Sequence, residues 1–144
     1  MQKKPDGRDA RQIYDMEADG SDLLTEALTS AQTSNKRVLL SLGANWCSDS
    51  QKTYDVLQTN PVLRSLIDEH YVLTLIDANN RVGHQRNQNL IDRYQVDIGH
   101  GIPVLLVLDP NGNLLTPNQD KRPIDSDHEH PEKLIAYLAQ NARK

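Results

Sequence analysis

The chain has 144 residues, the length of one ordinary domain and too short for two comfortable ones. Its formal net charge is −4 at pH 7 and no run of lysines and arginines occurs, which argues against nucleic acid or an anionic membrane surface as a partner. No stretch approaches the roughly 20 apolar residues that a membrane-spanning helix needs. The only cysteine, Cys47, excludes any disulfide within the chain.

The first residues of the chain differ from the rest in composition. Residues 1–18 are polar, so we interpret them as a mobile N-terminal arm with a short contact through Ile13 and Tyr14. We expect little chemistry in this arm. Residues 19–144 are then expected to form a single domain.

A helix and a strand are predicted before the cysteine. Apolar residues follow helical spacing from Ser21 onward, and Ser21 or Asp22 is placed to cap the first turn. Residues 38–42 form a nearly continuous apolar run that ends at Gly43, which is typical of a strand covered on both faces.

Helical and strand patterns alternate after the cysteine. Apolar residues between 54 and 67 predict a helix that Pro61 interrupts, with a second helical piece starting at this proline. Residues 71–76 form the second buried strand, and the apolar residues within 90–94 predict a short helix.

The last third of the chain predicts a hairpin and a closing helix. Residues 104–108 are a third apolar run, residues 109–112 are a strong turn signal, and Leu114 and Leu115 continue the apolar pattern. Pro131 suits the first turn of a final helix. The order predicts an α/β fold in which a mixed central sheet has helices on both faces, with parallel crossovers first and a hairpin last.

Cys47 is the first candidate for chemistry. It follows a predicted central strand and opens a helix, so unpaired backbone amides and the helix dipole would favour a negative charge on its sulfur. The thiolate is the nucleophile in thiol–disulfide exchange. A buried structural cysteine is the other interpretation that position alone leaves open.

Two segments carry a resemblance to a known family. Residues 44–50, Ala-Asn-Trp-Cys-Ser-Asp-Ser, resemble the Trp-Cys-x-x-Cys active-site segment of the thioredoxin superfamily, particularly bacterial thioredoxin-like proteins in which it reads Asn-Trp-Cys-x-Asp-Cys. Residues 101–104, Gly-Ile-Pro-Val, resemble the superfamily's second signature, a cis-proline loop that enters the third main strand. Their separation and the order of elements also match, so the resemblance covers residues 20–142 and implies a thioredoxin fold.

The resemblance also implies a role for each residue of these segments. Cys47 would be the attacking thiol, and Trp46 would be an aromatic flank that shapes the surface around it. Pro103 would be the cis-proline beside the sulfur, and Ile102 would offer backbone to an extended peptide. From the sequence alone, Pro103 could also be an ordinary proline at the start of a strand. The implied partner is a disulfide-containing protein or a small thiol, and no cofactor is implied.

Two positions depart from the family pattern. Ser50 stands where the family has its resolving cysteine, and Ser41 stands where thioredoxins proper have a buried acid that assists proton transfer. The sequence therefore predicts a monothiol exchange in which an external reductant such as glutathione releases a trapped substrate. Ser50 is either natural or the replacement of a parental cysteine. The alternative function is a redox-silent binding module that docks a peptide or a partner protein between Trp46 and Pro103.

Other polar residues are not predicted to be functional. Residues 127–130, Asp-His-Glu-His, could ligate a metal but lack a wider ligand pattern, so we expect no metal site. We interpret His100 as a solvated loop residue and Asp49 as a surface acid compatible with the helix dipole. A Cys-His-acid hydrolase has no local signature here.

Proteins that carry this active-site segment are often exported. The polar start of the chain fits a removed leader, so we expect the bacterial periplasm, with the cytoplasm as the alternative.

Overall fold

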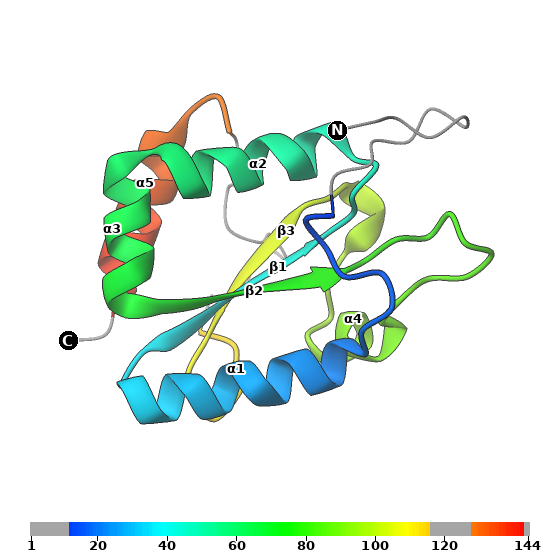
Figure 1. The fold of residues 1–144 in the computed structure, drawn as a ribbon, viewed down its shortest axis with the longest axis horizontal. Helices are drawn as coiled ribbons and strands as arrows, with labels where there is room; N and C mark the ends of the chain where they lie inside the picture. Colours follow the sequence, from blue (N-terminus) through cyan, green and yellow to red (C-terminus); the bar gives the residue numbers. More distant parts are fainter. Residues whose placement is uncertain (1–11, 116–127, 143–144) are drawn as a thin grey trace.

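A three-stranded mixed sheet lies at the centre of the computed structural model, which describes residues 12–115 and 128–142 (Figure 1). Helices join and cover the strands, as the alternating sequence pattern predicts. The elements in chain order are α1 (Gly20–Ser34), β1 (Arg37–Gly43), α2 (Ser48–Thr59), α3 (Pro61–His70), β2 (Tyr71–Asp77), α4 (Gln88–Arg93), the 3-10 helix η1 (Ile98–His100), β3 (Val104–Leu108) and α5 (Pro131–Gln140).

Strand β1 is the middle strand of the sheet order β2-β1-β3. It pairs in parallel with β2, from Arg37 opposite Tyr71 onward, and antiparallel with β3, where Leu42 lies opposite Val104. The carboxyl end of β1 therefore lies next to the start of β3, at the same end of the sheet. The loops next to these two ends are held side by side, although more than 50 residues separate them in the sequence.

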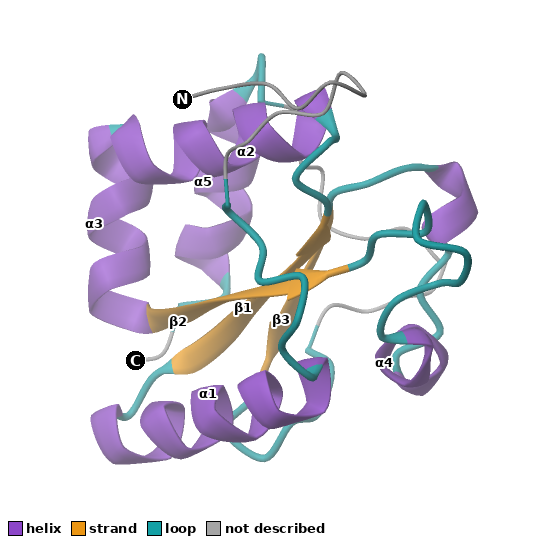
Figure 2. Ribbon diagram, turned by 45° about the vertical axis from the view of Figure 1, so that its right-hand side comes forward, coloured by secondary structure: helices purple, strands orange, loops and turns teal. Residues whose placement is uncertain are grey.

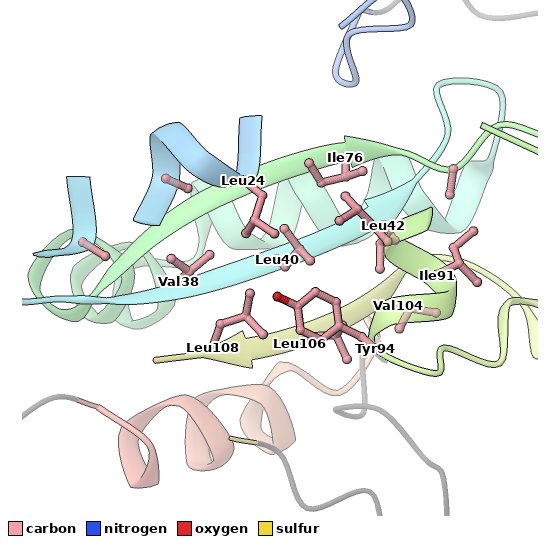
Figure 3. Close-up of a cluster of buried hydrophobic side chains, with 14 residues drawn as sticks. Leu24, Val38, Leu40, Leu42, Ile76, Ile91, Tyr94, Val104, Leu106 and Leu108 are labelled. Atoms are coloured by element: carbon pink, nitrogen blue, oxygen red, sulfur yellow. The ribbon is translucent and has the colours of Figure 1, made fainter. Parts of the chain in front are cut away.

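Helices cover both faces of the sheet, which confirms the predicted α/β class (Figure 2). Helices α1 and α4 pack on one face, and α2, α3 and α5 pack on the other. Successive side chains of a strand point to opposite faces, so β1 contributes to both cores. The first core contains the even-numbered β1 residues Val38, Leu40 and Leu42 (Figure 3), and the second contains Leu39.

The ends of three helices follow from local capping chemistry. Asp19 caps α1, since its carboxylate accepts a hydrogen bond from the Ser21 backbone amide at 2.8 Å. The predicted cap, Ser21 or Asp22, was therefore wrong: the N-cap is Asp19, and the helix begins at Gly20. Asn60 caps α3 ahead of Pro61, and Pro131 occupies the first turn of α5.

The predicted hairpin is formed only in part. The turn is present, because the Asp109 carboxylate accepts hydrogen bonds from the backbone amides of Asn111 and Asn113 at 2.8 and 3.0 Å. Beyond it, the structure over residues 12–115 and 128–142 has a single bridge, Leu108 to Leu114, instead of a fourth strand. The Leu115 amide also donates to the Val107 carbonyl oxygen at 2.9 Å, so the two predicted runs do pair in the antiparallel sense, although the second does not form a strand over the described residues.

Candidate functional site

Cys47 lies at the amino end of α2, just beyond the carboxyl end of β1. It is the N-cap residue of this 12-residue helix, and its side chain makes no capping hydrogen bond. The first backbone amides of a helix have no partner within the helix, so the sulfur lies where a negative charge is stabilised. Cys47 is half-buried, which leaves its sulfur partly accessible to a reactant.

The loop before β3 lies against this cysteine. The Cys47 thiol donates a weak hydrogen bond to the carbonyl oxygen of Ile102, with 3.7 Å between sulfur and oxygen. The peptide bond between Ile102 and Pro103 is cis, and Pro103 is buried while Ile102 is half-buried. The structure therefore brings together the two segments that carry the resemblance.

Trp46, next to Cys47 in the sequence, is held by a loop that follows β2. Its indole Nε1 donates to the Asn79 side-chain oxygen at 2.9 Å, and the backbone amide of Arg81 donates to the same oxygen at 2.9 Å. The Arg81 guanidinium stacks over the Trp46 ring, 3.6 Å from its centroid. A positive charge thus lies on the residue next to the cysteine.

Ser50 lies on the buried side of the site, in the first turn of α2. Its side chain is fully buried, and its hydroxyl oxygen accepts a hydrogen bond from the Ala44 backbone amide at 3.3 Å. Ser50 is thus closed off from solvent, whereas Cys47 is not.

Tyr14 reaches this buried side from the segment before α1. Only 1% of the residue is exposed, and its hydroxyl forms a 3.0 Å hydrogen bond with the Ser41 hydroxyl. Burial is the largest cause that raises the pKa of Tyr14, to about 12, with the Ser41 hydrogen bond acting in the opposite direction. Its phenol therefore stays protonated at neutral pH.

Gly43 makes room for this tyrosine. A Cβ atom at position 43 would lie 2.4 Å from the Tyr14 hydroxyl oxygen and 2.7 Å from the Ser50 hydroxyl oxygen. Both distances are too short for real contacts, so a side chain at Gly43 would displace the hydroxyl groups. Glycine is required here by the close approach of the tyrosine.

Asp77, at the end of β2, is the nearest buried acid that the structure describes on this side of the sheet. It pairs with Gly43 in the parallel register, and its carboxylate contacts the Arg86 guanidinium at 3.1 Å. Burial raises the pKa of Asp77, and the hydrogen bond from Arg86 opposes that rise. The Arg86 guanidinium therefore lies beside the buried Asp77 carboxyl group.

Comparison with known proteins agrees with this geometry. The thioredoxin-like family model matches residues 20–110, which is more than half of the chain. The chain belongs to the thioredoxin-like family. No curated protein sequence matches it.

Solved structures of thioredoxin-like proteins share the fold. A disulphide isomerase from Xylella fastidiosa Temecula1 is 25% identical with a TM-score of 0.75, over 92% of this chain and 98% of that one. The C-terminal domain of DsbD from Neisseria meningitidis, in its oxidised form, is 19% identical with a TM-score of 0.58, over 86% and 97% of the two chains. A thioredoxin from Thermus thermophilus is 21% identical with a TM-score of 0.56, over 81% of each chain.

The sequence missed several residues of this thioredoxin-like site. A short contact through Tyr14 was expected and is confirmed, but its place next to the site was not, because little chemistry was expected in the arm. Residues 1–11 of the arm are outside the described ranges. Asn79 and Arg81 lie in a polar loop with no periodic pattern. The one available signal was Gly43, because a glycine directly after a buried strand indicates a close approach by another group.

Two of the other polar residues considered in the sequence contact each other. His128 Nε2 lies 3.4 Å from an Asp49 carboxylate oxygen, and these exposed groups join the start of α2 to the segment before α5. Asp127 is outside the described residues. Within the described ranges no group of three His, Cys, Asp or Glu residues could hold a metal ion, and no helix is both long and apolar enough to cross a bilayer.

Proposed function

We propose that the protein is a thiol–disulfide oxidoreductase in which Cys47 alone attacks the substrate disulfide. The observation that carries the proposal is the position of the Cys47 sulfur, at the amino end of α2 and 3.7 Å from the carbonyl oxygen of Ile102. A sulfur in this position is both partly accessible and favoured as a thiolate. The 25% identity with a disulphide isomerase of the same fold supports the same chemistry.

The reaction is two successive thiol–disulfide exchanges. The Cys47 thiolate attacks one sulfur of a substrate disulfide, a new sulfur–sulfur bond forms, and the substrate bond breaks. The other substrate sulfur leaves as a thiolate and takes a proton from water. The protein then carries a mixed disulfide on Cys47.

Release of the mixed disulfide requires a second thiol from outside the chain. Ser50 occupies the place from which a resolving cysteine would attack, and a hydroxyl forms no disulfide. We propose that a small thiolate such as that of glutathione attacks the bound substrate sulfur. This step makes a new disulfide between the two and returns Cys47 to its thiolate, so electrons and atoms balance.

The proposed substrate is a disulfide-bonded protein or a small disulfide, bound between Trp46 and the Ile102–Pro103 loop. We propose that the Ile102 backbone receives an extended peptide; the support is that its carbonyl oxygen lies 3.7 Å from the Cys47 sulfur. Arg81 adds a positive charge over Trp46, and no carboxylate pairs with it within residues 12–115 and 128–142. The site therefore favours a disulfide that carries a negative charge.

The direct test is capture of the mixed disulfide. Incubation of the wild-type chain with oxidised glutathione is expected to add one glutathionyl group to Cys47, visible by intact-protein mass spectrometry. Reduced glutathione should remove it. Because the chain has one cysteine, Cys47→Ser is a complete control and should show no adduct. A wild-type chain that stays unmodified would contradict the proposal.

A redox-silent binding module is the second candidate. The observation in its favour is that Ser50 is fully buried and already hydrogen-bonded by the Ala44 amide, so the site is complete without a second thiol. A Cys47→Ser variant that retains full activity in the organism would favour this candidate.

The history of position 50 can be tested by restoring a cysteine. If Ser50 replaces a parental cysteine, Ser50→Cys should give multiple turnovers of disulfide reduction with a thiol-regenerating system. Failure of this variant to turn over would favour a natural monothiol. The bacterial periplasm remains the proposed compartment, and cell fractionation tests it against the cytoplasm.

A further inference from the structure

The side-chain oxygen of Asn79 accepts two hydrogen bonds at once. The Trp46 indole nitrogen and the Arg81 backbone amide both donate to it, each at 2.9 Å. An amide oxygen has two lone pairs, so both are occupied here. Asn79 is only 2% exposed. One buried oxygen therefore joins the residue before Cys47 to the loop after β2.

The backbone of Asn79 is held separately from its side chain. Its amide donates to an Asp77 carboxylate oxygen at 3.2 Å, and its carbonyl oxygen accepts a hydrogen bond from the Arg86 amide at 2.9 Å. Asp77 is the last residue of β2, and its buried carboxylate pairs with the Arg86 guanidinium at 3.1 Å. Because Asp77 belongs to the sheet, the sheet sets the position of Asn79.

Arg81 is exposed, yet its side chain has a defined position. The guanidinium lies 3.6 Å from the centroid of the Trp46 ring, within the range of a cation–π contact. In the part of the chain that the structure describes, no carboxylate forms an ion pair with this guanidinium. A guanidinium is planar and binds a carboxylate through two parallel hydrogen bonds. Arg81 can therefore receive a carboxylate from a bound molecule.

We propose that Asn79 is a positioning residue that holds Trp46 and Arg81 together as a carboxylate-binding subsite next to Cys47. This inference rests on the proposed function and deepens it, because it names the substrate class: a disulfide with a carboxylate within a few bonds of the attacked sulfur. An arginine side chain loses rotational freedom when it binds a ligand, and one already stacked on a ring loses less. The subsite binds the substrate and takes no part in the exchange of sulfur bonds.

The first test needs no reaction, because Trp46 is the only tryptophan of the chain. Its fluorescence is quenched with iodide, which is an anion, and with acrylamide, which is neutral, and the ratio of the two quenching constants is measured. A guanidinium over the ring raises the local concentration of iodide. Asn79→Ala should therefore lower the ratio about two- to threefold, and Arg81→Gln should lower it as far. A ratio that Asn79→Ala leaves unchanged would overturn the inference.

Gln85→Ala is the matched control for this measurement. Gln85 lies in the same loop, and its side-chain nitrogen donates to the carbonyl oxygens of Ala78 and Arg86 at 2.8 and 3.1 Å. The substitution removes two hydrogen bonds from the loop but none of those at the Asn79 oxygen, so it should leave the quenching ratio unchanged. If it lowers the ratio as far as Asn79→Ala does, general loosening of the loop explains the effect and the positioning role is wrong.

The second test measures mixed-disulfide formation with two small disulfides, the anionic dithiodipropionate and the neutral hydroxyethyl disulfide. Asn79→Ala should lower the ratio of the first rate to the second about two- to threefold. In an Arg81→Gln background it should have no further effect, because Asn79 acts through the guanidinium. An equal effect in both backgrounds would contradict this coupling.

A second variant keeps the inference testable if Asn79→Ala does not fold. Trp46→Leu removes the ring beneath the guanidinium at a half-buried position, and it should lower the same ratio of rates. A ratio equal to that of the wild-type chain would overturn the inference.

These outcomes are distinct from failure of the proposed function. A wild-type chain that forms mixed disulfides with both probes, together with unmoved ratios in Asn79→Ala, would leave the proposed function in place and reject the subsite. A wild-type chain that reacts with neither disulfide would reject the proposed function, and the quenching ratio would still decide whether Asn79 holds a positive charge over Trp46.

Discussion

The two faces of β1 differ in what they contact near the carboxyl end of the strand. On the face toward α1 and α4, Val38, Leu40 and Leu42 are apolar and fully buried throughout. On the opposite face the strand begins with buried Leu39, but Ser41 and Gly43 follow, and they contact the Tyr14 phenol instead of a hydrocarbon core. The first face is apolar along the whole strand, whereas the other changes from apolar to polar toward Cys47.

This difference shows how the fold separates stability from chemistry. Apolar burial contributes most of the folding free energy, and it needs no specific orientation. A buried hydroxyl costs free energy unless it is hydrogen-bonded, so a polar cluster persists only where its geometry is complete. The buried, hydrogen-bonded hydroxyls of Tyr14 and Ser41 lie on the face that could have continued as core, so apolar burial gives way to a polar contact at this end of the strand.

The largest expected effect compares neighbouring residues on the two faces. Leu40→Ala removes fully buried hydrocarbon and should lower the free energy of unfolding by about 3 kcal/mol, without moving the pH profile of Cys47 alkylation. Ser41→Ala should cost only about 1 kcal/mol, because it removes one hydrogen bond to Tyr14 and no buried hydrocarbon. Urea unfolding of both variants and alkylation of Leu40→Ala check this, and a reversed pattern would remove the distinction between the faces.

A smaller effect is expected from the titration of Tyr14. Its pKa is raised from 10.0 to about 12, so the folded state holds the phenolic proton more tightly than the unfolded chain does. This contribution to stability is complete below pH 10 and is lost as the pH rises toward 12. Between about pH 8 and about pH 11, the wild-type chain should lose about 1.4 kcal/mol more than Tyr14→Phe. Equal losses in urea unfolding at the two pH values would contradict the buried placement of Tyr14.

The smallest expected effect concerns the exposed side of the site. The rate of mixed-disulfide formation is measured with oxidised glutathione, an anionic disulfide, and with cystamine, a cationic one. Arg81→Gln should lower the ratio of the first rate to the second by about three- to fivefold. The ratio cancels any change in the nucleophile itself. Arg64→Gln is the control, since Arg64 lies on α3 and pairs with Asp68 at 3.2 Å. A ratio that high salt does not reduce would show that charge plays no part.

The sequence was most informative where a pattern repeats or a motif is local. Apolar runs and proline positions predicted β1, β2, β3 and the break between α2 and α3, and the two resembling segments lie together because β1 and β3 are neighbours. The turn signal at Asp109 correctly predicted the antiparallel return of Leu114 and Leu115, but it does not determine whether such a return forms a full strand.

Single residues that act over long distances could not be predicted. A contact through Tyr14 was expected, but its partners were not, since its contacts with Ser41 and Asn45 span 27 and 31 residues. Arg81 meets Trp46 only because Asn79 binds both residues. No periodic pattern marks such contacts, because each depends on the fold that other residues make.

The most direct test of the central claim compares the reactivity of Cys47 in the folded chain with its reactivity in the unfolded chain. At about pH 6, where an ordinary thiol is largely protonated, the rate of mixed-disulfide formation with oxidised glutathione is measured in the native chain and in the same chain unfolded in urea. We predict that the native chain reacts faster, because the fold stabilises the thiolate at the start of α2. A native rate equal to or below the unfolded rate would contradict an active nucleophile at Cys47.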